Sequence, residues 1–171
     1  GYMHRYASYD FCYGYFYEHR NNPEFFSEER NIKMTCMILW SYLSSWGMLR
    51  GSSLLLQRSP AYLKILIDNF ISKKENKDLW NIDVEYTNDN IKRLISSYKG
   101  IKECLKEVKP SKTLITKIML GVYGNVPAFD TYFTMTFKDI FKDSNEKGYG
   151  FSSLNKDTLG LISKFYKANK A

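Results

Sequence analysis

The sequence has little of the material that metal sites and disulfide frameworks need. Its three cysteines, Cys12, Cys36 and Cys104, lie far apart and form no Cys-x-x-Cys pair, and its two histidines both lie near the start of the chain. This pattern argues against a zinc site and a disulfide framework, and it is typical of the reducing cytosol. We therefore expect a cytoplasmic protein with no metal and no other cofactor.

Long hydrophobic runs are also missing. The longest uncharged run covers residues 34–49 and is interrupted by a threonine, several serines and a glycine. A membrane-spanning helix needs roughly 20 predominantly apolar residues. The first residues also lack the charged and then apolar pattern of a secretory signal. We expect no membrane span and no signal segment.

The chain is nevertheless rich in the residues that fill a core. It has 171 residues, of which 44% are hydrophobic and 16% aromatic. That length and composition are enough for a substantial buried core and far from those of a disordered chain. Because no repeat or low-complexity linker divides the sequence, we predict one compact domain over residues 1–171.

Apolar residues recur three and four positions apart through most of the chain, which indicates amphipathic helices. Helices are expected over residues 5–19, 27–49, 60–70, 87–99, 101–108, 111–122, 128–141 and 154–167. Residues 79–84 alternate briefly, as a short strand or an extended segment would, but no second segment could pair with them. The predicted fold class is therefore all-α, with about seven or eight helices.

Several features of these helices depend on single residues. Ser27 is expected to cap the helix over 27–49, whose apolar residues go almost all the way round, so that this helix should be central. Gly100 is expected to interrupt the helical pattern that begins after Thr87. Residues 73–78 are mostly charged and are expected to form an exposed loop.

The positive charge is concentrated in the second part of the sequence. The formal net charge is +7, and residues 1–57 carry equal numbers of basic and acidic side chains, so the surplus lies in residues 58–171. Between residues 99 and 117 the lysines are Lys99, Lys102, Lys106, Lys109, Lys112 and Lys117. Such an excess favours nucleic-acid phosphates or an acidic partner. Alternatively, it is the solvated surface of a lysine-rich chain from an AT-rich genome.

A second candidate anion site is the Arg50-Gly-Ser-Ser segment, which interrupts an otherwise apolar region. Arg50 together with Ser52 and the backbone of this turn could bind an anion. Alternatively, Arg50 is the structural partner of a carboxylate such as Asp10.

The stretch from residue 109 to residue 130 combines several special residue types. Lys-Pro-Ser-Lys-Thr-Leu-Ile-Thr-Lys117 is followed by a Gly and Pro break and by Asp130 at the head of the next predicted helix. Over residues 105–135 this arrangement resembles the helix-hairpin-helix DNA glycosylase superfamily, in which a Thr-Lys or Ser-Lys helix precedes a helix opened by Asp. The resemblance implies base excision on DNA, without an iron–sulfur cluster. Residues 46–53 and 124–130 also resemble segments of uncharacterised bacterial proteins.

The resemblance implies a role for each candidate residue. Asp130 would stabilise the positive charge that develops on the sugar, and Lys117 would be an amine nucleophile or a phosphate clamp. Nucleic acid would be held by Lys109, Ser111, Lys112, Thr113, Arg50 and Ser52. The simpler alternatives are that Asp130 only caps its own helix and that Lys117 is a surface lysine.

A non-catalytic protein is the competing interpretation. The lysine-rich segment and the N-terminal stripe of Tyr6, Tyr9, Tyr13, Phe16 and Tyr17 could bind DNA, RNA or an acidic protein, although such stripes more often belong to a core. If Lys117 and Asp130 converge on a concave pocket wide enough for a base, the enzyme is favoured; if they point apart on a convex surface, it fails.

Overall fold

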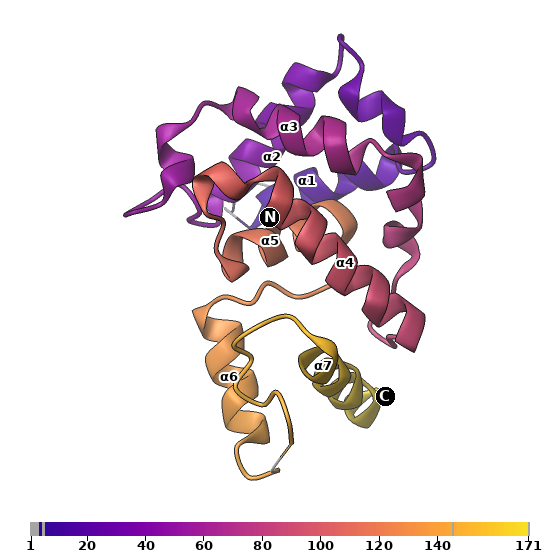
Figure 1. Cartoon of the computed structure of the whole chain (residues 1–171), viewed down its shortest axis with the longest axis vertical. Helices are drawn as coiled ribbons and strands as arrows, with labels where there is room; N and C mark the ends of the chain where they lie inside the picture. Colours follow the sequence, from indigo (N-terminus) through magenta and orange to yellow (C-terminus); the bar gives the residue numbers. More distant parts are fainter. Residues whose placement is uncertain (1–3, 5, 145, 171) are drawn as a thin grey trace.

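The chain folds into helices joined by short turns (Figure 1). The computed structural model describes residue 4, residues 6–144 and residues 146–170. Its α-helices are α1 (Ala7–Glu18), α2 (Ile32–Ser45), α3 (Lys64–Leu66), α4 (Asn88–Cys104), α5 (Lys112–Tyr123), α6 (Thr131–Phe141) and α7 (Lys156–Asn169). Short 3₁₀ helices and one π turn lie between them, and the described residues contain no β-strand. The prediction of one all-α domain is confirmed.

Helix α5, rather than the predicted helix over 27–49, lies at the centre of the core. Every residue from Leu114 to Tyr123 is buried except Leu120, and α5 packs against α1, α2 and α4. Helix α2 is less enclosed than its apolar sequence suggests, because Met34 and Met37 remain 59% and 48% exposed.

A glycine lets α2 and α5 approach each other closely. A Cβ built on Gly121 would lie 2.4 Å from the Tyr42 ring, a distance that only glycine permits. The Tyr42 hydroxyl then donates a 3.0 Å hydrogen bond to the carbonyl of Lys117. This contact fixes the tyrosine of α2 against the middle of α5.

Local signals set several helix starts as predicted, but not all of them. The side chains of Thr87, Ser111 and Asp130 each accept a hydrogen bond from a backbone N–H in the first turn of α4, α5 and α6. The Ser27 prediction is wrong: Ser27 ends a 3₁₀ helix over Pro23–Ser27 and donates to Glu24, and α2 begins only at Ile32.

Two predicted interruptions are in fact helical. Helix α4 runs through Gly100, where a Cβ would lie 2.6 Å from Phe70. The glycine therefore provides room for a neighbouring ring and does not break the helix. The predicted charged loop and the beginning of the possible strand instead form a 3₁₀ helix over Lys74–Asn81. This helix buries Trp80, whose indole N–H donates a 2.7 Å hydrogen bond to the Val122 carbonyl.

The aromatic stripe of α1 is only partly in the core, since Tyr6 and Tyr17 are 50% and 40% exposed and Tyr9 and Tyr13 are half-buried. Phe16 is fully buried, and Tyr9, Tyr13 and Tyr17 stack along the helix with ring centroids 5.7 and 5.4 Å apart. Tyr13 also lies against Gly124 at the C-terminal end of α5. The core interpretation therefore holds for Phe16, in part for Tyr9 and Tyr13, and not for Tyr6 and Tyr17.

Helices α6 and α7 lie together on one side of α1–α5 (Figure 1). Their shared interior is aromatic, since the rings of Phe133, Phe137 and Phe151 contact one another and Phe137 also contacts Phe165. Phe129, which precedes α6, joins this cluster through Phe133 and Phe151. The segment from α5 to α6 is thus held by the core of both parts.

Candidate functional site

A groove lies between the loop after α2 and the segment that leads into α5. Its volume is about 510 Å³, and its walls are formed by residues from 47 to 54 and from 108 to 114. The groove brings together Arg50 and Ser52 from one segment with Lys109, Ser111 and Thr113 from the other. These residues, which are distant in the sequence, were all candidates for nucleic-acid contact.

Arg50 is exposed on one wall of the groove. Gly47 has a φ of +77°, and a Cβ placed there would lie 3.2 Å from the guanidinium carbon of Arg50. Any other residue at this position would therefore both strain the turn and displace the arginine. No carboxylate in the described part of the chain pairs with Arg50, so the proposed structural pairing with Asp10 is not found.

Lys109 lies on the opposite wall in an uncommon backbone conformation. Its φ and ψ are 46° and 62°, in the left-handed region, where it ends a 3₁₀ turn over Lys106–Val108. A residue with a side chain is strained there, and glycine or asparagine usually occupies such positions. The lysine is exposed. A strained charged residue at the edge of a groove is more typical of a functional position than of a structural one.

The N-terminus of α5 closes the end of the groove. Ser111 accepts a 3.1 Å hydrogen bond from the Leu114 N–H and so caps the helix. Thr113 lines the groove but uses its hydroxyl proton on the Phe129 carbonyl at 3.0 Å. Lys112 does not line the groove: its amine donates to the Phe151 carbonyl at 2.7 Å, and burial lowers the pKa of this amine.

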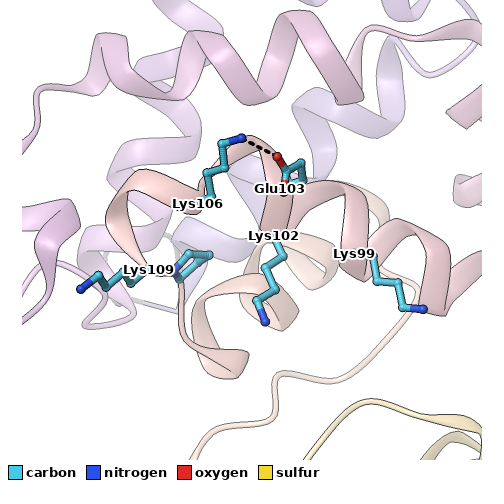
Figure 2. Close-up of a pocket in the computed structure, with 6 residues that line it drawn as sticks. Lys99, Lys102, Glu103, Lys106 and Lys109 are labelled. Atoms are coloured by element: carbon cyan, nitrogen blue, oxygen red, sulfur yellow. Dashed lines mark hydrogen bonds and ion pairs between the residues drawn. The ribbon is translucent and has the colours of Figure 1, made fainter.

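A lysine-rich surface continues from the groove along α4 (Figure 2). A shallow hollow of about 390 Å³ is lined by Lys99, Lys102, Glu103, Lys106, Lys109 and Pro110. Lys106 turns to Glu103 at 2.6 Å, a contact that raises the pKa of Lys106, whereas Lys99, Lys102 and Lys109 extend away from the glutamate (Figure 2). Lys109 and Pro110 line both hollows. We call the surface of Arg50, Lys109, Lys102 and Lys99 the basic track.

The two predicted catalytic residues, Lys117 and Asp130, do converge. The Lys117 amine lies 3.9 Å from Oδ2 of Asp130 and donates a 2.7 Å hydrogen bond to the Trp46 carbonyl. The Lys117 side chain is only 6% exposed and that of Asp130 is 26% exposed. The alternative of a surface lysine is thus wrong, because α5 is the central helix. The capping alternative for Asp130 is confirmed, since its Oδ1 accepts from the Phe133 N–H at 3.0 Å.

Two threonines on α5 hold Asp130 beside Lys117. Thr113 donates to the carbonyl of Phe129, and the buried hydroxyl of Thr116 accepts from the N–H of the same residue at 2.8 Å. Both backbone groups of the residue before Asp130 are therefore fixed to one face of α5. Thr116 was not predicted as a site residue, although the Thr-x-x-Thr-Lys117 spacing places both hydroxyls on one side of a helix.

The pair lies next to the groove without forming its wall. Neither Lys117 nor Asp130 lines the groove, whereas Thr113, one turn before Lys117, does. Lys117 also contacts the groove segment directly, because its amine binds Trp46, the residue before Gly47. The site therefore has two adjoining parts, an open basic groove and a more enclosed Lys117–Asp130 pair.

The chain was compared with protein families, curated proteins and solved structures. No family model, no curated protein and no solved structure matches the chain. Across the described ranges, histidine, cysteine and acidic side chains nowhere gather in a group of three or more that could hold a metal ion. None of the helices formed by those residues is both long and apolar enough to cross a membrane.

Proposed function

We propose that this chain binds nucleic acid, with DNA as the expected ligand, and that the groove between the α2 loop and α5 holds the phosphate backbone. The observation that carries the proposal is the meeting of Arg50 and Lys109 across one groove. Neither cation is paired with a carboxylate of the described residues. Two unneutralised cations facing one hollow favour an anion as the occupant.

The donors at the groove suit phosphate oxygens. A guanidinium can bind two phosphate oxygens at once, and an ammonium adds a second, more mobile charge. Ser52 and Ser111 provide hydroxyls, and the first backbone N–H groups of α5 point toward its N-terminal end, where the helix dipole also favours negative charge. Contacts of these kinds position a nucleic-acid backbone without reading its sequence.

The length of the basic track favours a polymer over a single small anion. Lys99 and Lys102 lie three residues apart on α4, and Lys109 follows the 3₁₀ turn that comes after this helix. Lys109 joins this surface to the groove. A chain of phosphates could contact several cations of the basic track, whereas a single phosphate could contact only those at one end of the track.

Binding should be measured by fluorescence anisotropy with labelled oligonucleotides at several salt concentrations. Arg50→Ala and Lys109→Ala should each weaken binding and make the slope of log K against log salt shallower by about 1. Lys33→Ala is the matched control, because this exposed lysine lies at the opposite end of α2 and its loss changes the net charge equally. Equal losses in all three variants, or none, would contradict the proposal.

A second candidate function, base excision, is supported by the convergence of Lys117 and Asp130, but the pair does not line the groove, so only the first half of the condition set from the sequence is met. In this reaction water adds to the sugar carbon as the glycosidic C–N bond breaks, and a carboxylate takes the proton from water and passes it to the departing base. Asp130 is the group proposed for that role, and Lys117 would orient it. The amine of Lys117 donates to Trp46, which favours positioning over nucleophilic attack.

Asp130→Asn tests base excision selectively. Asparagine caps helices about as well as aspartate, so the variant keeps the start of α6 while removing the carboxylate. Release of normal and modified bases from duplex DNA should be abolished in the variant, with circular dichroism and oligonucleotide affinity unchanged. Equal release by both proteins, or release by neither, would leave the non-catalytic binding protein as the function.

A further inference from the structure

The first turn of α6 carries an aromatic side chain that the fold does not use. Tyr132 is 85% exposed, more than any other large hydrophobic side chain of the described residues. Its neighbour Phe133 points the other way and stacks on Phe129 and Phe137. The aromatic core of α6 is therefore complete without Tyr132, whose ring presents its faces to solvent.

Tyr132 lies close to the groove along the chain that borders it. Thr113 lines the groove and is hydrogen-bonded to the carbonyl of Phe129, three residues before Tyr132. Three residues span at most about 10 Å. Because Thr116 also binds the Phe129 N–H, this short connection is anchored at its start. A strand whose phosphates occupy the groove could thus reach the ring with an adjacent nucleotide.

The first turn of α6 offers a phosphate no cationic side chain. Residues 131–134 carry no charge, and the Asp130 carboxylate before them is already engaged by the Lys117 amine and the Phe133 N–H. The cations lie instead on the groove side. A ligand with alternating anionic and aromatic parts matches this division, with phosphates over Arg50 and Lys109 and a base over Tyr132.

We infer that Tyr132 stacks on an unpaired base of a strand held in the groove, so that the ligand is single-stranded or locally unpaired nucleic acid. This inference rests on the proposed function and narrows it to one ligand class. A base in an intact duplex has both faces covered by its neighbours and cannot stack on a protein ring. An aromatic side chain stacks on any exposed base, so little sequence preference is expected.

The inference is tested by comparing Tyr132→Ala and Tyr132→Phe with the parent protein. The probes are a labelled single strand, the same sequence as a duplex, and a single strand containing the fluorescent base 2-aminopurine. Tyr17→Ala is the matched control, because Tyr17 is also exposed but lies on α1 toward the end of α5 that is remote from the groove.

The parent should bind the single strand more tightly than the duplex and quench the 2-aminopurine fluorescence. Tyr132→Ala should weaken single-strand binding about tenfold and remove the quenching, while leaving duplex binding unchanged. Tyr132→Phe should retain both effects, because the ring remains. Tyr17→Ala should behave like the parent.

Three results would overturn the inference, and they differ in what they say of the proposed function. If Arg50→Ala weakens binding but Tyr132→Ala does not, the groove binds nucleic acid and the stacking inference alone fails. If the parent binds no oligonucleotide, both fail. If Tyr132→Ala instead converts a dimer to a monomer in analytical ultracentrifugation and leaves strand affinity unchanged, the ring belongs to an interface between copies of this chain.

Discussion

At the scale of single residues, the site contains one residue with an uncommon backbone conformation and one buried charged side chain. Lys109 has a left-handed backbone, and Lys117 is a lysine inside the core. Glycine at position 109 would relieve the backbone strain if the fold were the only constraint, whereas removal of Lys117 would leave the Trp46 carbonyl and the Asp130 carboxylate without their buried partner. The buried hydroxyl of Thr116 has a structural role: it donates to the Lys112 carbonyl and accepts from the Phe129 N–H, which holds the segment before Asp130.

Lys109→Gly should separate stability from binding. Glycine adopts the left-handed region without strain, although it loses more backbone entropy on folding, so we expect a net gain of about 0.5–1 kcal/mol in the free energy of unfolding. Oligonucleotide affinity should fall because the ammonium is lost. Urea unfolding and anisotropy measure the two effects, and a destabilised variant would show that the lysine stem contributes to packing.

Thr116→Val should release the start of the α5–α6 connection. Valine has nearly the same shape but leaves the Phe129 N–H without its acceptor, which costs about 1–3 kcal/mol in the free energy of unfolding. Hydrogen exchange of the Phe129 amide should accelerate more than that of amides in α4. Thr116→Ser, which keeps the hydroxyl, serves as the control and should retain protection of that amide.

At the scale of elements, glycines decide how closely the helices pack. Gly100 in α4 and Gly121 in α5 both accommodate an aromatic ring of another segment at a distance that a Cβ would not allow. Gly160 in α7 has no atom within 4 Å of a Cβ placed on it. Glycine is therefore required for close packing at positions 100 and 121, whereas nothing near position 160 requires it.

Gly121→Ala and Gly160→Ala form a matched pair of substitutions. Alanine at 121 would collide with the Tyr42 ring and should reduce the free energy of unfolding by about 1–3 kcal/mol. Alanine at 160 meets open space and should raise it by up to about 1 kcal/mol through helix propensity. Chemical denaturation checks both values. A stabilised Gly121→Ala would mean that α2 and α5 can move apart freely.

Helix boundaries could be predicted from the sequence where they depend on residues within one turn of the boundary. The starts of α4, α5 and α6 were predicted because Thr87, Ser111 and Asp130 act within one turn of their own helix. Gly100 was misjudged because its effect depends on Phe70 of another segment, whereas Ser27 was misjudged because it ends a local 3₁₀ helix by donating to Glu24 and does not begin α2. A glycine in a helix looks the same in sequence whether it ends the helix or admits a neighbouring ring.

At the scale of the whole molecule, the described charged side chains lie at least partly exposed, with Lys117 as the exception. The basic track presents exposed cations on one surface, while the buried tyrosines Tyr42, Tyr86 and Tyr123 fill space around α5. The hydroxyls of Tyr42 and Tyr86 donate to the carbonyls of Lys117 and Asn125. Burial raises the pKa of Tyr42, Tyr86 and Tyr123 well above the ordinary value of 10.0.

These tyrosines predict unfolding in alkali. In the unfolded chain they ionise near pH 10, whereas the folded state keeps them neutral, so stability is intact below pH 10 and is lost as the pH rises above it. The three together should cost on the order of 4 kcal/mol per pH unit in that range. The part of the tyrosinate absorbance that comes from these three of the 14 tyrosines should appear together with the loss of helical circular dichroism. Tyrosinate absorbance that saturates before helicity is lost would contradict this.

The sequence by itself determined the helical class, several helix caps and the types of residue that could contact phosphate, because periodicity and capping act over a few neighbouring positions. Only the tertiary structure decided that Arg50 faces Lys109, that Lys112 turns away to Phe151, and that Lys117 is buried beside Asp130. These relations join segments that are distant along the chain. They follow from the packing of α5 between α1, α2 and α4, which depends on the shapes of all the helices at once.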